Sequence, residues 1–177
     1  MKEIEVKILE VDRPQLEAKL IDLGASKHFD DRMEALFFDY PDGRITATGE
    51  LCRIRREGKQ VQLTYKQPIS QAEAKIMKEL ELTVSNQDTM MAILTALGMK
   101  VINQTIKHRT EYILNDVSIV FDKYAGALAH IPEFIEVEAP NLARMEETIE
   151  LIGFKLKDAQ SWHTYDLVKH YENKNRA

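Results

Sequence analysis

The sequence has very little cysteine: Cys52 is its one cysteine among 177 residues. A single cysteine excludes an intrachain disulfide and a metal site built from clustered cysteines. Leu51 and Ile54, which lie close by in the sequence, are apolar. We therefore expect Cys52 to be a small core residue, because a nucleophilic role would need an activating partner that the sequence does not show.

Long apolar runs are also absent. No stretch approaches the roughly 20 apolar residues that a helix needs to cross a bilayer. The N-terminal residues alternate between polar and apolar, and they lack the apolar segment of a signal peptide. We expect a cytoplasmic protein that does not bind a membrane.

A surplus of basic residues is lacking as well. The 24 Lys and Arg residues are outnumbered by 29 Asp and Glu residues, and the formal net charge is −5. Proteins that bind the phosphate backbone of nucleic acids are more often basic overall, so no nucleic-acid partner is expected. The length suits one compact domain and no linker-like segment divides the chain, so we expect a single domain over residues 1–177.

The pattern that dominates the chain is an alternation of apolar and charged residues with a period of two, which is typical of β-strands. Glu3, Glu5 and Lys7, for example, share one face of a predicted strand whose other face is apolar. The pattern predicts strands over residues 2–8, 51–56, 60–66, 76–82, 106–113, 117–122 and 134–138. The protein should therefore be mainly β.

Amphipathic helices interrupt these strands. Four are expected: from the cap Asp12 to Gly24, from Asn86 or Asp88 to Gly98, from about Asn141 to Gly153, and over residues 162–171. Each of the first three follows a strand of the form Glu-x-Glu, so a strand-then-helix unit recurs three times.

The polar faces of the strands are sorted by the sign of their charge. Two are basic and three are acidic: Arg53/Arg55, Lys107/Arg109, Glu3/Glu5, Glu79/Glu81 and Glu136/Glu138. Like charges on one face repel each other, and a surface selected only for solubility would intersperse the two signs. In one interpretation these faces nevertheless point to water, and the apolar faces pack on the helices.

In the other interpretation the sheet closes, the charged faces line an interior, and the helices cover the apolar outside. A buried charge is tolerable only if it is paired, hydrogen-bonded or bound to an ion, so such an interior needs a highly charged guest. A polyphosphate fits, since Arg and Lys bind its oxygens and carboxylates bind a divalent cation that bridges them. Oxygen-only ligands favour Mg²⁺ or Mn²⁺ over zinc.

Taken together and in order, the motifs resemble those of the CYTH superfamily, the triphosphate tunnel metalloenzymes. Along the chain these motifs are ExExK at 3–7, an aromatic segment at 37–39, RxR at 53–55, LTYK at 63–66, ExE at 79–81, KxR at 107–109, Asp122 and FxExE at 134–138. Each motif is short, but their common order covers nearly the whole chain. Residues 37–66 and 131–138 resemble most the branch that is similar to class IV adenylyl cyclases.

The resemblance implies a mainly β fold with flanking helices (α+β), in which a closed eight-stranded antiparallel β-barrel forms a tunnel. It implies that Mg²⁺ or Mn²⁺ is bound by Glu3, Glu5, Glu138, Glu136 and Asp122. It also implies that a triphosphate is bound by Lys7, Arg53, Arg55, Lys66, Lys107 and Arg109, and that Glu79 and Glu81 hold a second metal or tether these cations. Within these sets, the residues expected to be catalytic are Glu3, Glu5, Lys7, Lys66 and Asp122.

The function implied first is that of a class IV adenylyl cyclase, which converts ATP to cyclic AMP and pyrophosphate. The alternative is a triphosphatase that acts on tripolyphosphate or thiamine triphosphate. The motifs contact only the triphosphate, so they do not choose between the two. A non-catalytic module that binds polyphosphate or nucleotides is a third hypothesis, against which the retained carboxylates argue, and a homodimer is one of the assemblies left open.

Overall fold

The computed structural model describes residues 2–70 and 74–174, and the side chains of Lys2 and Glu3 lie outside that description. The strands are β1 (Lys2–Leu9), β2 (Ser26–Asp39), β3 (Leu51–Glu57), β4 (Gln60–Ser70), β5 (Lys75–Thr83), β6 (Lys100–Leu114), β7 (Val117–Tyr124), β8 (Phe134–Ala139) and β9 (Ala159–Gln160). The helices are α1 (Arg13–Asp22), α2 (Arg44–Ala47), α3 (Gln87–Ala96), α4 (Leu142–Leu151) and α5 (Thr164–Lys174), with short 3₁₀ turns η1 (Gly126–Leu128) and η2 (Leu156–Asp158).

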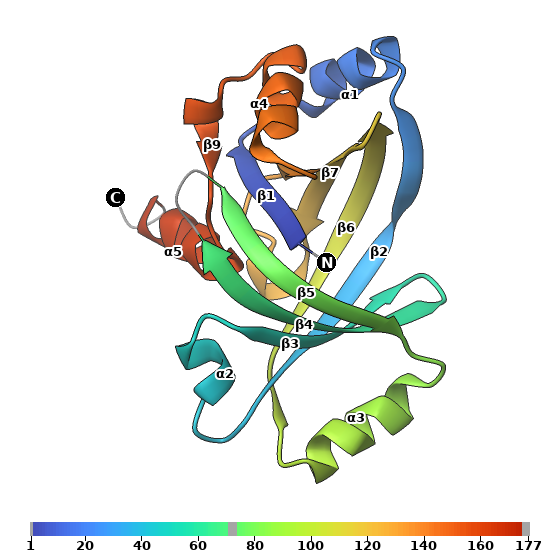
Figure 1. Cartoon of the computed structure of the whole chain (residues 1–177), viewed down its shortest axis with the longest axis vertical. Helices are drawn as coiled ribbons and strands as arrows, with labels where there is room; N and C mark the ends of the chain where they lie inside the picture. Colours follow the sequence, from blue (N-terminus) through green and yellow to red (C-terminus); the bar gives the residue numbers. More distant parts are fainter. Residues whose placement is uncertain (1, 71–73, 175–177) are drawn as a thin grey trace.

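The strands form one sheet that closes on itself. Their order is β5-β4-β3-β2-β6-β7-β8-β1-β9, and β5 also pairs with β1 (Figure 1). That last pairing closes eight of the nine strands into a barrel, and β9 is added beside β1. Every pairing is antiparallel. The closed eight-stranded barrel is therefore confirmed.

Every strand predicted from alternation is present, and β2 is a further long strand that alternation did not predict. Only the last residues of β2, 37–39, belonged to a motif, and β6 begins at Lys100 instead of residue 106. The early residues of both strands are largely exposed, and polar and apolar residues do not alternate there, so they give no period-two signal. The final helix spans 164–174 instead of 162–171, and the four-residue helix α2 and the two-residue strand β9 were not predicted.

Three helices begin at the residues that the sequence indicated. In each case the side chain of the cap accepts a hydrogen bond from a backbone N–H three residues further on, at 3.1 Å for Asp12, 2.8 Å for Asn86 and 2.9 Å for Asn141. Such a cap contributes about 1 kcal/mol to helix stability. The helices α1, α3 and α4 follow β1, β5 and β8, so the predicted strand-then-helix repeat is confirmed.

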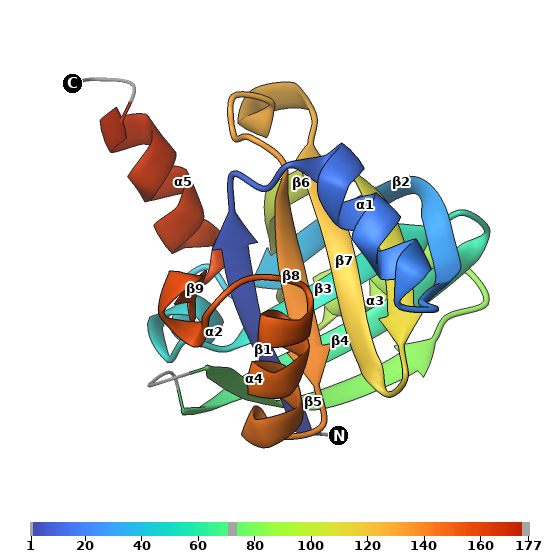
Figure 2. The same ribbon diagram turned by 90° about the horizontal axis from the view of Figure 1, so that it is seen from above.

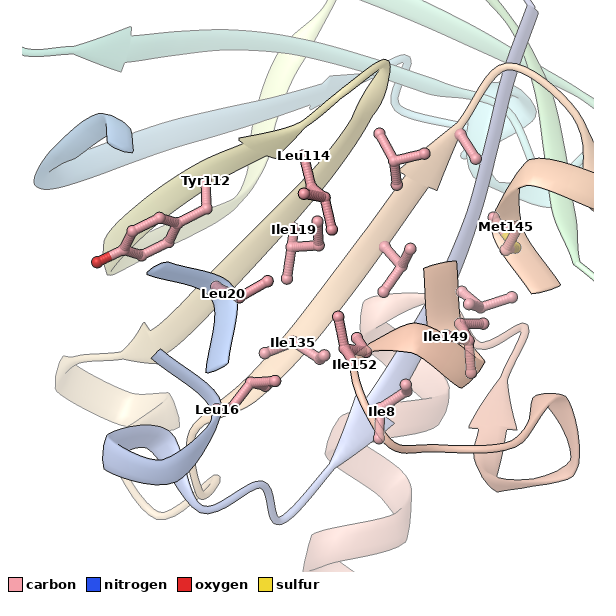
Figure 3. Close-up of a cluster of buried hydrophobic side chains, with 14 of the residues drawn as sticks. Ile8, Leu16, Leu20, Tyr112, Leu114, Ile119, Ile135, Met145, Ile149 and Ile152 are labelled. Carbon is pink, nitrogen blue, oxygen red and sulfur yellow. The ribbon is translucent and has the colours of Figure 1, made fainter. Parts of the chain in front are cut away.

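Most apolar side chains of the barrel point outward and are covered by helices. The largest cluster joins the outer faces of β1, β6, β7 and β8 to α1 and α4 (Figures 2 and 3). Within it Leu20, Ile119, Ile135 and Ile149 are fully buried. Each such side chain contributes roughly 1.5–3 kcal/mol relative to an exposed one. The largest part of the core thus lies between the barrel wall and the helices. The inner face carries the charged residues together with a few apolar ones, such as Val120 opposite Glu136.

A second cluster joins the outer faces of β2, β3 and β4 to α2 and α3. Cys52 belongs to this cluster and is buried, as predicted. Burial raises the pKa of its thiol to about 11, so the thiol is protonated and unreactive at neutral pH.

The third cluster lies at one end of the barrel. Tyr124 and Phe134, which project from the ends of β7 and β8, pack against Leu167 and Tyr171 of α5. Helix α5 therefore contacts apolar side chains at this end of the barrel. None of the helices within residues 2–70 and 74–174 has the length and apolar character needed to span a bilayer.

Candidate functional site

The strand register places the charged motifs on the inner face of the barrel. Glu5 lies opposite Glu138, and Lys7 lies opposite Glu136, across the β1–β8 pair. Residues directly opposite each other in an antiparallel pair project to the same face. Ile4 and Val6, the sequence neighbours of Glu5, belong to the outer apolar cluster, so the charged set projects into the lumen.

The same register continues around the barrel. Arg109 of β6 lies opposite Asp122 of β7, and Lys66 of β4 lies opposite Glu79 of β5. Arg53 of β3 has Thr64 of β4 as its partner. The interpretation in which the charged faces line a closed interior is therefore correct, and a half-exposed open sheet is excluded.

Lys7 lies at the centre of a buried ion network. Its Nζ is 2.6 Å from Glu136 Oε1 and 3.4 Å from Glu5 Oε1. Arg109 continues the network, because its Nη2 is 2.7 Å from Glu136 Oε2 and 2.6 Å from Asp122 Oδ2. The Arg109 Nε also donates to the other oxygen of Asp122, at 2.8 Å. Only 3% of the Lys7 side chain and none of the Asp122 side chain is exposed.

Two lysines complete the network. Lys107 donates to Asp122 Oδ2, and Lys75 donates to Glu5 Oε1. The resulting chain of contacts alternates in sign throughout, and we call it the central network: Lys75, Glu5, Lys7, Glu136, Arg109, Asp122 and Lys107. It contains four cations and three carboxylates, so the positive charges are in excess.

These contacts keep the buried groups ionised. Burial opposes the charged form of Lys7, but Glu136 and Glu5 outweigh it and raise the pKa of Lys7 above its ordinary value. Burial likewise opposes the charge of Glu5, yet Lys7 and Lys75 lower its pKa to about 2. Glu5 is therefore a carboxylate at neutral pH. In contrast, burial and the neighbouring Arg109 lower the pKa of Lys107.

A second set of polar contacts lies on β3, β4 and β5. The Nη2 of Arg55 is 3.4 Å from Glu81 Oε2, and the Thr64 hydroxyl donates to the same oxygen at 3.0 Å. Lys66 Nζ is 3.5 Å from Glu79 Oε2. Glu79 and Glu81 thus both contact predicted triphosphate-binding residues, which favours the tether role that the sequence left open for them.

Carboxylates from β1 and β8 share one wall of the lumen. Glu5 and Glu136 both contact Lys7, and Glu138 is the cross-strand partner of Glu5. As they stand, no three acidic or histidine side chains within the described part of the chain converge as a metal site. The backbone of Glu3 pairs with Met77 on the same wall, but the Glu3 side chain lies outside the described residues. The donor types and their common wall fit Mg²⁺ or Mn²⁺.

Sequence reasoning missed Lys75. The predicted strand began at residue 76, one position too late, so Lys75 was left outside it. A signal was present, because Lys75 lies an even number of residues before Glu79 and Glu81, and side chains at such positions of a strand share one face. Thr64, which donates to Glu81, was likewise on a predicted polar face but was not assigned to the site.

A pocket of about 430 Å³ lies away from the central network, beside α2. It is lined by Tyr40, Arg44, Ile45, Glu50, Cys52, Tyr65 and Met99. Its charged groups already have partners within the chain: the Tyr65 hydroxyl donates to Glu50 at 2.6 Å, and Arg44 contacts Asp42. We therefore place the candidate site in the barrel lumen, where buried charges of both signs converge.

The chain matches a known family over most of its length. The family model of the CYTH domain matches residues 1–157 of the 177. The chain therefore belongs to the CYTH domain family, as the order of its motifs implied.

Individual proteins resemble the chain in sequence or in fold. A Methanocaldococcus jannaschii protein named "putative adenylate cyclase" is 28% identical over 138 residues, which cover 78% of this chain and 77% of that protein. The structure of a "putative adenylate cyclase" from Vibrio parahaemolyticus is 14% identical, has a TM-score of 0.81, and covers 94% of this chain and 97% of its own. The structure of a "putative adenylyl cyclase" from Hippeastrum, for which a dominant triphosphatase activity is described, is 14% identical with a TM-score of 0.68 and covers 96% and 95%. At these identities the two structures show a common fold.

Proposed function

We propose that this chain is a divalent-metal-dependent enzyme that binds a triphosphate in the barrel lumen and breaks one of its phosphoanhydride bonds. The observation that carries the proposal is the central network, in which four cations and three carboxylates alternate inside a closed barrel. Guanidinium and ammonium groups donate strong hydrogen bonds to phosphate oxygens. Because Lys7, Lys107 and Arg109 are largely buried, such donors also stabilise the charge that develops during phosphoryl transfer.

The residues take distinct roles in this proposal. The cations that bind the phosphates are Lys7, Arg53, Arg55, Lys66, Lys107 and Arg109. Both oxygens of Asp122 accept from Arg109, and one also accepts from Lys107, which favours a positioning role for Asp122 over a role as a metal ligand. Glu79 and Glu81 tether Lys66 and Arg55.

A divalent cation would be held by the carboxylates of one wall: Glu3, Glu5, Glu136 and Glu138. Once bound, Mg²⁺ or Mn²⁺ supplies Lewis-acid chemistry, because it neutralises negative charge on the phosphate oxygens. The protein's own part is to keep these carboxylates ionised, and the lowered pKa of Glu5 serves that purpose.

Within this class we favour ATP as the substrate. The 3′-oxygen of the ribose forms a bond to the α-phosphorus, the bond from that phosphorus to the bridging oxygen breaks, and pyrophosphate leaves. The proton of the 3′-hydroxyl passes to solvent, and the products are cyclic AMP and pyrophosphate. The names of the Methanocaldococcus and Vibrio proteins support this choice.

The second candidate is a triphosphatase, and the dominant triphosphatase activity described for the Hippeastrum protein supports it. A water oxygen then forms a bond to the terminal phosphorus, the bond from that phosphorus to the bridging oxygen breaks, and the diphosphate part of the substrate leaves. The water gives up a proton to solvent, and the products are orthophosphate and pyrophosphate or thiamine diphosphate. The same lumen cations would serve both reactions, because each reaction needs the triphosphate chain held along charged donors.

Product analysis tests the proposal and separates the candidates. The protein is incubated with ATP and with tripolyphosphate, each with Mg²⁺ or Mn²⁺. Cyclic AMP with pyrophosphate supports the cyclase, and orthophosphate supports the triphosphatase. Binding without any product would indicate a non-catalytic module, and neither binding nor product would overturn the proposal.

A matched pair of variants links the activity to the lumen. Glu5→Gln removes a metal-binding charge at constant shape, and we expect turnover to fall by about 10²-fold or more. Glu10→Gln, at a half-exposed position just beyond the same strand, should keep wild-type turnover. Equal activity of Glu5→Gln and wild type would remove Glu5 from the site.

A further inference from the structure

Lys75 is the nearest cation to Glu5. Its Nζ contacts Glu5 Oε1 directly, whereas Lys7 Nζ is 3.4 Å from the same oxygen. Lys7 is turned instead toward Glu136, at 2.6 Å. Of these two ammonium groups, Lys75 is therefore the closer to Glu5, and it occupies one of the two oxygens through which Glu5 could bind a metal ion.

An ammonium group and a divalent cation compete for that oxygen. The lone pairs of Glu5 Oε1 that accept from Lys75 are not free to bind a metal, and the two cations repel each other at close range. The carboxylate nevertheless needs a counter-charge when no metal is bound, since a buried and unpaired carboxylate is strongly destabilising. Metal binding through Glu5 Oε1 would therefore displace Lys75.

The position of Lys75 suits such a displacement. Lys75 is the first residue of β5, and its pairing with Glu5 is the last of the β1–β5 register. Its side chain is 12% exposed, against 3% for Lys7. Lys7 is held in mid-strand, with cross-strand partners in both β8 and β9. Of the two lysines, Lys75 is the one at a strand end.

We propose, building on the function proposed above, that Lys75 is an exchangeable counter-ion. It neutralises Glu5 when no divalent cation is bound, leaves Glu5 when the metal binds, and then donates to an oxygen of the triphosphate. Metal alone must separate Lys75 from Glu5 without offering it a new partner. When a triphosphate binds together with the metal, Lys75 donates to a triphosphate oxygen instead. Each of the two ligands therefore raises the affinity for the other, by the same factor.

The test uses two binding measurements on Lys75→Met. First, Mn²⁺ alone is titrated and followed by the electron paramagnetic resonance signal of free Mn²⁺. The variant should bind Mn²⁺ about tenfold more tightly than wild type, the scale of one charge-assisted hydrogen bond. Second, the magnesium complex of tripolyphosphate is titrated by calorimetry. The variant should bind this complex about tenfold more weakly, because the displaced ammonium is missing.

These opposite changes distinguish an exchangeable counter-ion from simpler roles. If Lys75 only bound phosphate, its removal would leave the affinity for Mn²⁺ unchanged. If its role were purely structural, its removal would weaken the binding of both ligands. Lys78→Met is the matched control, since Lys78 lies on the same strand, is exposed and has Gln67 as its cross-strand partner in β4. Lys75→Arg, which keeps the charge, should resemble wild type. Lys75→Gln repeats the test if the methionine variant does not fold.

Failure of this inference is distinguishable from failure of the proposed function. If wild type binds both Mn²⁺ and the magnesium complex but Lys75→Met does not show the two opposite changes, only the role of Lys75 is overturned. If wild type binds neither ligand, or if Glu5→Gln binds Mn²⁺ as wild type does, the lumen is not the proposed metal site and both proposals fall.

Discussion

Glu5 remains ionised inside the barrel because two lysines outweigh the cost of its burial. Burial raises its pKa, and Lys7 and Lys75 then lower it from an ordinary 4.5 to about 2. A lowered pKa means that Glu5 contributes stability that is fully present above its unfolded-state pKa and is lost as the pH falls through the folded value. The acid sensitivity of the fold should therefore depend on this residue.

We expect the free energy of unfolding of wild type to fall more steeply than that of Glu5→Gln between about pH 5 and about pH 2. The amide carries no titrating charge, so the variant starts less stable and loses less on acidification. Urea unfolding at a series of pH values measures both slopes. Glu172→Gln, an exposed position on α5, should keep the wild-type slope. Identical slopes for Glu5→Gln and wild type would contradict the assigned ion pairs.

Arg55 and Arg56 are consecutive residues of β3, so their side chains point to opposite faces of the strand. Arg55 is partly buried and contacts Glu81 in the lumen, whereas Arg56 is exposed and donates to Gln87. Arg55→Ala should weaken tripolyphosphate binding roughly tenfold or more, because a guanidinium contact to phosphate is lost. Arg56→Ala should leave binding unchanged. Calorimetric titration of both variants measures this, and normal binding by Arg55→Ala would remove this strand from the site.

At the scale of elements, α2 depends on one buried carboxylate at the end of β2. Asp39 is fully buried and accepts hydrogen bonds from the backbone N–H groups of Tyr40, Ile45 and Thr46, at 2.7, 3.0 and 2.9 Å. Burial opposes its charge, but these donors lower its pKa. A helix of four residues has little intrinsic stability, so these hydrogen bonds to Asp39 hold α2 in place.

Asp39→Asn should therefore destabilise the protein by about 1–3 kcal/mol, since an amide group would be left facing backbone donors. Asp42→Asn, whose side chain is 57% exposed, should change stability by less than about 0.5 kcal/mol. Thermal and urea unfolding measure both. Binding of tripolyphosphate should survive in Asp39→Asn, because α2 lies outside the lumen. Equal stability of the two variants would show that the Asp39 contacts are not needed.

At the scale of the whole molecule, the barrel gathers basic side chains from strands far apart in the sequence into one lumen. A ligand that binds only the folded state stabilises it by RT ln(1 + [L]/Kd), about 2.7 kcal/mol at a hundredfold excess over Kd. Tripolyphosphate should raise the melting temperature markedly, whereas orthophosphate, which carries fewer charges and cannot span the lumen, should raise it much less at equal concentration.

Added salt should reduce the difference between the two anions, but less than it would for exposed charges, because an enclosed site is poorly screened. Melting curves with both anions at low and high ionic strength measure the effect. Equal shifts for the two anions would mean that the lumen cations do not act as one elongated site.

Local patterns in the sequence determined the secondary structure and the two faces of each strand. Period-two alternation is a property of neighbouring residues, so it predicted strands with one charged and one apolar face. The caps Asp12, Asn86 and Asn141 were equally local signals, and all three were confirmed. At the start of β2 and β6, where the residues are largely exposed, no such signal exists, so β2 was not predicted from alternation and β6 was predicted too short.

Only the tertiary structure determined which cation contacts which carboxylate. Lys7 and Glu136 are 129 residues apart in sequence, and Lys75 and Glu5 are 70 apart. Such pairs depend on strand register across the closed barrel, and a slip by one residue would turn every side chain to the other face. The sequence alone determined that charges of each sign are grouped on strands. The closure of β5 onto β1 brought them into one network, and it placed Lys75, which no motif had marked, beside Glu5.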